Sequence, residues 1–175
     1  HNECIKAHRP LNHDYSMPLA ETASTFNECV VMASAIAKAA DDQEKLALIE
    51  SQLQDATQII CDIYSRFRFE KSVFEKRPEE FMHADTLCQL MTDAQKASYG
   101  DGLDPETLHP YMWVCKGHYY GPTFYNFPYA FGGLFARGLY AQYEKEGQSF
   151  IPKYTKLLHT TPVATAENVA KVADI

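Results

Sequence analysis

Two glutamates, Glu21 and Glu28, lie in a stretch of small residues and could serve a metal or another cation. The stretch reads Leu-Ala-Glu-Thr-Ala-Ser-Thr-Phe-Asn-Glu. On a helix, this spacing puts both carboxylates on one face, about 10 Å apart. The small side chains between them let another element pack closely, and a carboxylate on a close-packed face needs a cation or a metal as partner. Taken alone, the pattern also fits an ordinary solvated helix face.

The second candidate is the aromatic segment 109–129, which holds the only tryptophan of the chain. Its glycines and prolines prevent one continuous regular helix. An irregular segment can aim N–H and O–H donors at a developing oxyanion, which is the need of an acyl-transfer site. The alternative is an aromatic wedge that packs the end of a bundle. The polar rings of the segment are His109, Tyr111, His118, Tyr119, Tyr120, Tyr125 and Tyr129.

Composition narrows the class of protein. The 175 residues carry 16 Lys and Arg against 23 Asp and Glu, a net charge of −7. An acidic chain without a basic cluster is a poor partner for nucleic acid, and no apolar run is long enough to cross a membrane. The five cysteines are odd in number and form no Cys-x-x-Cys pair, which is typical of reduced thiols in the cytoplasm. The chain begins with His1 and no signal peptide follows, so we expect a fragment of a longer protein.

The elements that position these residues are predicted to be helices. An apolar stripe at steps of three and four runs from Leu46 to Phe67, ends at Glu70 and predicts a long helix that faces the core of a bundle. Asp41 to Glu44 form an acidic corner before it. Asp104 and Pro105 predict a short helix with Asp104 as its N-cap. Further helices are expected over 18–40, 79–99 (with Phe81 on its core side), 128–145, 149–158 and 165–173. With no alternation typical of strands, the predicted fold class is all-α, a helical bundle.

Together, the two candidate segments resemble the C-terminal part of the thimet oligopeptidase and oligoendopeptidase F family of zinc metallopeptidases, and more closely its oligoendopeptidase F branch. The residues that carry the resemblance are 14–28, with Ala-Glu-Thr-Ala-Ser at their centre, and 118–132, with His-Tyr-Tyr and Tyr-Asn-Phe-Pro-Tyr-Ala-Phe-Gly. The likeness extends over essentially the whole chain. It implies that residues 1–175 are a single helical fragment, the C-terminal portion of the catalytic domain of a larger helical metallopeptidase.

The resemblance also implies roles for individual residues. These enzymes bind zinc through the two histidines of an HExxH helix and one downstream glutamate, and Glu21 stands at the position of that glutamate. Glu28 would orient a zinc-bound histidine. His118, Tyr125 and Tyr129 match positions that contact the substrate and stabilise the tetrahedral intermediate.

Two departures from the family pattern limit these roles. Thimet-type members carry a further tyrosine where Gly132 stands here, so that role is lost or passes to Tyr119 or Tyr120. A substrate contact by His109 is also open. The sequence contains no HExxH motif; His1 matches a non-ligand histidine just after that helix, so the fragment begins just beyond it. Because two zinc ligands and the catalytic base would then be missing, we predict that the chain hydrolyses nothing on its own.

Three functions remain open. The first is a fragment of a zinc-dependent oligopeptidase (a metalloendopeptidase) in the cytoplasm, with short peptides as substrates and the missing N-terminal part of the same protein as partner. The second is a non-catalytic helical scaffold or peptide-binding module descended from the same family. The third and weakest is an unrelated carboxylate-bridged di-metal bundle, which would place Glu-x-x-His pairs on facing helices.

Overall fold

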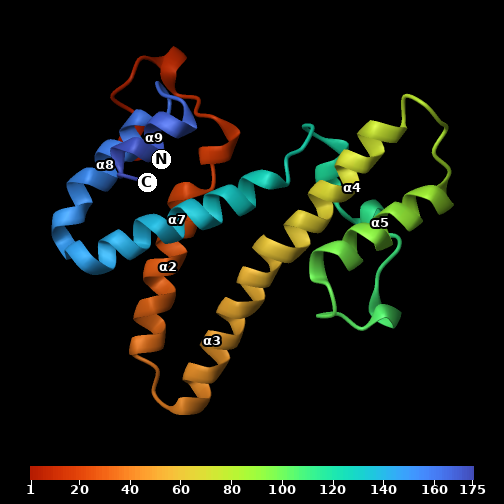
Figure 1. Cartoon of the computed structure of the whole chain (residues 1–175). Coiled ribbons are helices and arrows are strands. Elements are labelled where there is room, and N and C mark those ends of the chain that lie inside the picture. Colours follow the sequence, from red (N-terminus) through yellow and green to blue (C-terminus); the bar gives the residue numbers. More distant parts are fainter. The chain divides into compact units, whose positions relative to one another are not determined.

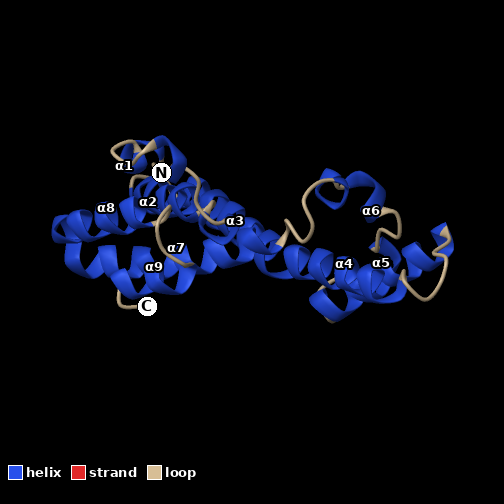
Figure 2. Ribbon diagram, turned by 90° about the horizontal axis from the view of Figure 1, so that it is seen from above, coloured by secondary structure: helices blue, strands red, loops and turns tan.

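The computed structural model describes all 175 residues and contains helices, turns and loops but no strand, as Figures 1 and 2 show. The all-α expectation is therefore confirmed. The chain divides into two compact units, the first made of His1–Gln52 and Phe131–Ile175 and the second of Leu53–Ala130. Each unit is described separately below. That the chain forms a single piece of a larger catalytic domain stays a prediction.

Nine α-helices make up most of the chain, and short 3₁₀ turns lie between several of them. One π-helical turn, η3 (Gln58–Asp62), joins α3 to α4, so the backbone is helical from Asp42 to Lys76. The α-helices are α1 (Asn2–Ile5), α2 (Thr22–Ala37), α3 (Asp42–Thr57), α4 (Ile63–Lys76), α5 (Ala84–Tyr99), α6 (Met112–Cys115), α7 (Phe127–Glu146), α8 (Ile151–Thr160) and α9 (Ala166–Val172).

The core of the first unit gathers apolar side chains from α2, α7, α8 and α9. Phe26 of α2 lies at its centre, with its ring stacked on Tyr154 at 4.2 Å between centroids and close to Phe150 at 6.1 Å. Leu139 and Leu157 are fully buried in the same cluster. Burial of such side chains contributes about 1.5–3 kcal/mol each, which makes this cluster the main source of stability in the unit.

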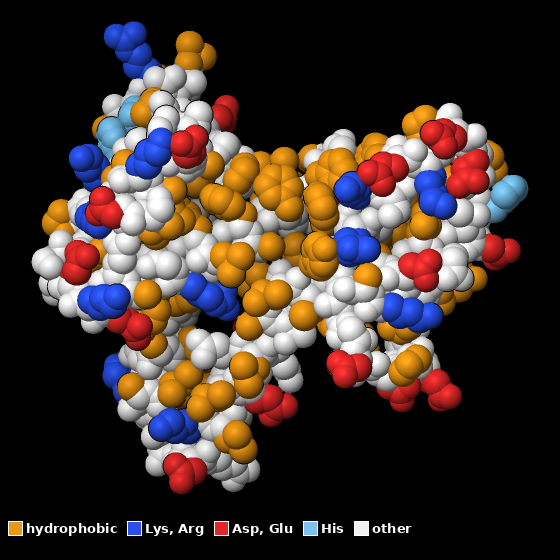
Figure 3. All heavy atoms as spheres, viewed as in Figure 1, with side chains coloured by type: hydrophobic (Ala, Val, Ile, Leu, Met, Phe, Trp, Pro, Cys, Tyr) orange, Lys and Arg blue, Asp and Glu red, His pale blue; other side chains and the backbone are white.

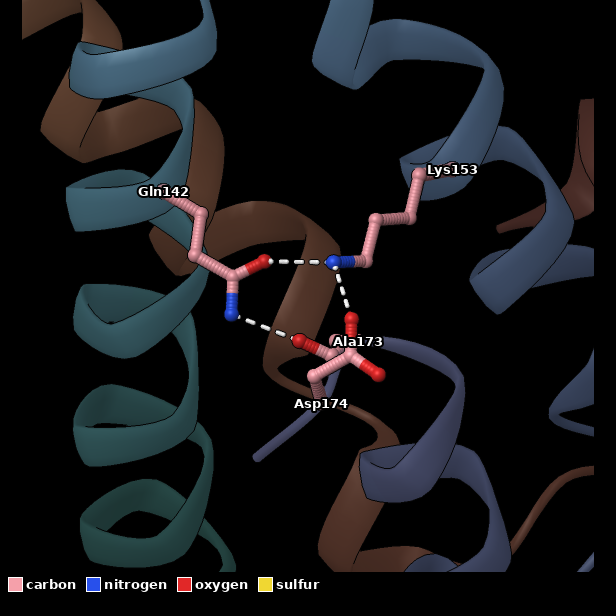
Figure 4. Close-up of polar contacts among 4 residues, drawn as sticks. All are labelled: Gln142, Lys153, Ala173 and Asp174. Atoms are coloured by element: carbon pink, nitrogen blue, oxygen red, sulfur yellow. Dashed lines mark hydrogen bonds and ion pairs between the residues drawn. The ribbon is translucent and has the colours of Figure 1, made fainter.

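A polar cluster ties the end of the chain to α7 and α8 (Figure 4). The Nζ atom of Lys153 donates to Gln142 Oε1 at 3.1 Å and to Asp174 Oδ2 at 2.7 Å. The side-chain amide of Gln142 donates in turn to the carbonyl oxygen of Ala173 at 2.6 Å. The residues after α9 are therefore fixed to two other helices by side-chain hydrogen bonds.

The second unit is built on the pair α4 and α5, which lie side by side (Figure 1). Phe69 and Met91 are buried between them, with Trp113 packed against this core. Gln95 on α5 binds the backbone of His109 through both ends of its amide, donating to the carbonyl oxygen at 2.9 Å and accepting from the N–H at 3.0 Å. This double hydrogen bond holds the start of the aromatic segment on α5.

The long helix predicted over 46–67 is confirmed, but much of its apolar stripe is not core-facing. Leu46, Leu53 and Ile60 are 66%, 63% and 55% exposed, and α3 has no buried residue. Ile63, by contrast, is only 3% exposed. The helical period specifies which side chains share a face, whereas only packing by another element decides whether that face is buried.

The helix predicted over 79–99 begins later than expected. The N–H groups of Glu79 and Glu80 both donate to the carbonyl oxygen of Lys76, at 3.0 and 3.1 Å, so these residues complete the end of α4 instead. Phe81, placed on the core side by the sequence pattern, is 81% exposed. The α5 helix itself starts only at Ala84.

Two predicted helix starts are confirmed. The side chain of Asp104 accepts from the N–H of Glu106 at 3.0 Å, with Pro105 in the first position of a 3₁₀ turn. At the acidic corner, Asp41 Oδ1 accepts from the N–H of Glu44 at 2.8 Å. The Glu44 carboxylate accepts from the N–H of Ala40 at 2.6 Å in return, an arrangement close to a capping box.

Apolar side chains are frequent on the surface (Figure 3). Those with the largest exposed fractions include Leu11, Phe81 and Val31. None of the helices combines the length and the apolar character that a bilayer crossing requires.

Candidate functional site

Glu21 lies at the N-terminal boundary of α2 and is half-buried. The hydroxyl of Ser24 donates to Glu21 Oε2 at 3.2 Å and to the carbonyl oxygen of Glu21 at 3.1 Å. An ionised carboxylate offers about four acceptor positions, so one hydroxyl donor leaves most of them available to a cation. On this observation Glu21 suits the role of a single metal ligand.

The backbone of α7 packs directly onto Glu21. A Cβ atom built on Gly132 would lie 2.8 Å from Glu21 Cβ and 3.3 Å from its carbonyl carbon. Such a contact is too short for any side chain, so residue 132 must be glycine in this packing. A larger side chain at this position, such as tyrosine, would not fit this packing.

Glu28 is exposed, whereas Ala23 and Phe26 on the opposite side of α2 are buried. The small residues of this helix do allow close packing, as the sequence pattern predicts. They bring α7 against Glu21 at the end of the helix and leave Glu28 in solvent. A role for Glu28 in orienting a metal ligand stays a prediction.

His118, Tyr125 and Tyr129 lie together in the second unit and form what we call the His/Tyr cluster. The rings of His118 and Tyr125 are stacked, with centroids 5.7 Å apart and planes within 7°. The ring of Tyr129 meets both edge-on, at 5.8 and 5.9 Å. Its hydroxyl oxygen lies 3.4 Å from Nε2 of His118. All three rings are half-buried, so the cluster presents an imidazole and two phenols at a partly dry surface.

The other two tyrosines proposed for the substrate, Tyr119 and Tyr120, contact other residues of the second unit. Tyr119 packs edge-on against Phe69 at 5.1 Å, in the core of the unit. Burial there raises the pKa of its phenol. Tyr120 is 67% exposed, and its hydroxyl donates to the carbonyl oxygen of Trp113 at 3.2 Å. His109 has an exposed side chain on a backbone held by α5.

Comparison with known proteins shows to which family the chain belongs. The model of "Peptidase family M3" matches residues 1–160. The chain belongs to peptidase family M3. That finding confirms the resemblance to the oligoendopeptidase F-like metallopeptidases, and it extends over both candidate segments.

Curated M3-type relatives agree with this assignment. Oligopeptidase PepF of Bacillus subtilis is 26% identical over 160 residues, which cover 90% of this chain and 24% of that protein. The oligoendopeptidase F homolog of Borreliella burgdorferi is 27% identical over 151 residues (85% and 25%). That of Lactococcus lactis subsp. lactis is 27% identical over 154 residues (79% and 26%). The chain spans about a quarter of the length of these relatives. No solved structure matches it significantly.

No group of three or more His, Cys, Asp or Glu side chains is arranged to hold a metal ion. Two Glu-x-x-His spacings occur in the sequence, Glu80 to His83 and Glu106 to His109, but both fall outside the α-helices. The facing helical pairs of a di-metal bundle are therefore not formed by these residues. Glu21 fits the part of one ligand only.

Sequence reasoning missed one residue of this region, Glu70 on α4. Its side chain is buried, and Oε1 accepts a hydrogen bond from the backbone N–H of Phe124 at 2.8 Å. The available signal was the position of Glu70 itself, because a carboxylate at the end of an apolar stripe must find a partner if the helix face is buried. The identity of that partner, 54 residues along the chain, could not be inferred from the pattern.

Proposed function

We propose that this chain is part of a zinc-dependent oligopeptidase that hydrolyses short peptides. The observation that carries the proposal is the His/Tyr cluster, in which His118, Tyr125 and Tyr129 are in mutual ring contact in a chain of peptidase family M3. The names of the relatives, oligopeptidase and oligoendopeptidase, support short peptides as substrates. The proposed partner is the remainder of a longer polypeptide. The proposed setting is the cytoplasm, since all five cysteines are free.

In this proposal, Glu21 supplies one carboxylate ligand, and the other ligands and the catalytic base come from outside this chain. Zinc, when bound, polarises the scissile carbonyl and lowers the pKa of its bound water. Gly132 lets the backbone of α7 pack directly against Glu21 and so fixes the position of the Glu21 backbone. Glu28 would act on a zinc-bound histidine by accepting its second N–H.

The His/Tyr cluster would bind the oxygen that becomes negatively charged in the reaction. The hydroxyl oxygen of Tyr129 lies 3.4 Å from Nε2 of His118. In the tautomer with a proton on Nε2, that N–H and the Tyr129 hydroxyl would both be free to donate to one oxyanion bound beside them. Tyr125 stacks on the imidazole and fixes its plane. Tyr120 and His109 are exposed and would contact the peptide farther from the scissile bond. Tyr119, being buried, would support this segment from below.

The test is peptide cleavage by the full-length protein after loading with zinc. Glu21→Gln should lower the zinc content and abolish cleavage, because the amide is a weak ligand. Tyr129→Phe should keep the zinc and lower kcat by about 100-fold, as expected for the loss of one oxyanion donor. A matched control is Tyr64→Phe, an exposed phenol on α4, which should leave both unchanged. If the zinc-loaded full-length protein cleaves no short peptide, the proposal is wrong and the chain is a scaffold or peptide-binding module.

A further inference from the structure

The segment that carries Tyr125 has an unusual backbone and little regular structure of its own. Residues 121–126 lie between a 3₁₀ turn, Gly117–Tyr120, and the start of α7. Within it, Phe124 has a φ angle of 56°, in the left-handed region that a bulky residue rarely occupies. Such a conformation costs free energy and persists only where the surroundings impose it. Something outside the segment must therefore hold Phe124.

That support comes from α4 at both the backbone and the ring of Phe124. The Glu70 carboxylate accepts from the Phe124 N–H at 2.8 Å. The Phe124 ring lies 5.5 Å from the ring of Phe67 and 5.3 Å from that of Phe74. All these residues belong to the second unit. A hydrogen bond to a carboxylate is roughly twice as strong as one between neutral groups, so the contact with Glu70 is a strong backbone support for Phe124.

Glu70 is the last member of a polar series at steps of four that runs from η3 into α4 and is buried from Asp62 onward. The Gln58 amide donates to Asp62 Oδ2 at 2.6 Å, and Asp62 forms an ion pair with Arg66. Asp62, Arg66 and Glu70 are all buried. A buried carboxylate destabilises a fold unless it is paired. Oε1 of Glu70 accepts from the loop, whereas Oε2 is buried without a hydrogen-bond partner. The hydrogen bond from Phe124 therefore offsets part of the cost of burying the Glu70 carboxylate.

We infer that Glu70 is a positioning residue for the His/Tyr cluster. By holding the Phe124 N–H, it sets the left-handed turn that places the next residue, Tyr125, parallel to His118. Its loss lets the turn relax and separates the two stacked rings, although Glu70 touches neither of them. The inference rests on the proposed function only in so far as the cluster acts on a peptide; the positioning itself is a property of the chain.

The experiment is hydrogen exchange and NMR on the 175-residue chain. The Phe124 amide should be protected in the unmodified chain, and the His118 ring protons should carry the shift that a stacked tyrosine causes. Glu70→Ala should raise the exchange rate of that amide at least about tenfold and move the His118 signals toward those of a free histidine. Glu70→Gln retains an acceptor and should restore most of both. The matched control is Glu75→Ala on the same helix, an exposed glutamate paired with Lys71, which should change neither.

Two outcomes overturn the inference. An unprotected Phe124 amide in the unmodified chain does so without any variant, as does a Glu70→Ala chain in which amide and His118 signals stay unchanged. Failure of the proposed function is recognised separately, in the full-length protein. There, Glu70→Ala should lower kcat more than it raises KM, with partial recovery in Glu70→Gln. If the rings separate and cleavage is unaffected, Glu70 positions the cluster as inferred but the cluster does not act on the peptide.

Discussion

The two candidate regions are held in place by different forces. Glu21 sits against α7 through the missing side chain of Gly132, a steric contact in which the nearest polar support is the Ser24 hydroxyl. The His/Tyr cluster sits on a segment held by a buried carboxylate and by ring contacts. A steric contact fails when atoms are added, and a polar anchor fails when atoms are removed. The two regions should therefore respond to opposite kinds of substitution.

The largest effect is expected from removing a buried charge of the second unit, the Asp62 carboxylate. Asp62→Ala leaves the buried Arg66 guanidinium without its partner and should lower the free energy of unfolding by about 3–5 kcal/mol. Urea unfolding of the chain measures it. The exposed pair Lys71–Glu75 is the control, since Glu75→Ala should cost at most about 1 kcal/mol. Equal losses in the two variants would mean that the buried Asp62–Arg66 pair stabilises the second unit no more than an exposed pair does.

The next effect is expected from adding one methyl group beside Glu21. Gly132→Ala forces a carbon against the Glu21 backbone and should cost about 1–3 kcal/mol in the same unfolding measurement. Gly138→Ala, on the same helix, meets only the end of the Ile175 side chain at 3.2 Å. That variant should be neutral or up to about 1 kcal/mol more stable because alanine favours the helix. If Gly132→Ala is equally harmless, the steric description of the first region is wrong.

A pH effect tests the burial of Tyr99 in the second unit. Burial, together with the nearby Asp62 carboxylate, raises the pKa of the Tyr99 phenol to about 12 from its ordinary value of 10.0. The unfolded chain releases this proton near pH 10 and the folded chain only near pH 12, so stability falls as the pH rises between these values. Tyr99→Phe should show a smaller fall in unfolding free energy from pH 9 to pH 11 than the unmodified chain. An identical fall would mean that this phenol is not buried as described.

The smallest effect is expected from the polar contact in the first region. Ser24→Ala removes the hydroxyl that donates to Glu21 at 3.2 Å. Because both groups are partly solvated, the cost should stay below about 1 kcal/mol in urea unfolding. A loss as large as that of Gly132→Ala would show that Glu21, too, is held by a polar anchor, and the contrast between the regions would disappear.

Local features of the fold could be predicted from sequence because they depend on neighbouring residues. The long helix follows from the spacing of Leu46 to Phe67, and the Asp104 cap from the proline after it. The exposure of Leu46, and that of Phe81, could not be predicted in this way. Periodicity identifies a face, whereas burial depends on which distant element covers it.

The candidate site, too, could be predicted from sequence only in part. His118, Tyr125 and Tyr129 are close in sequence, and a resemblance to known peptidases pointed to all three before their rings were seen to meet. Glu70 and Phe124 are far apart in the chain, and their contact exists only because α4 passes under the loop. Chemistry-bearing residue types can be recognised from sequence, whereas the residues that aim them are found only in three dimensions.

The π-helical turn η3 sets the phase between the side chains of α3 and those of α4. A π turn accommodates one residue more than an α-helical turn, which shifts the phase of every later side chain by about 100° around the axis. Deleting a single residue from Gln58–Asp62 would keep the helix continuous but change by about 100° the phase between the side chains of α3 and those of α4. The turn is thus a one-residue insertion that decides which side chains of α3 share a face with the buried side chains of α4.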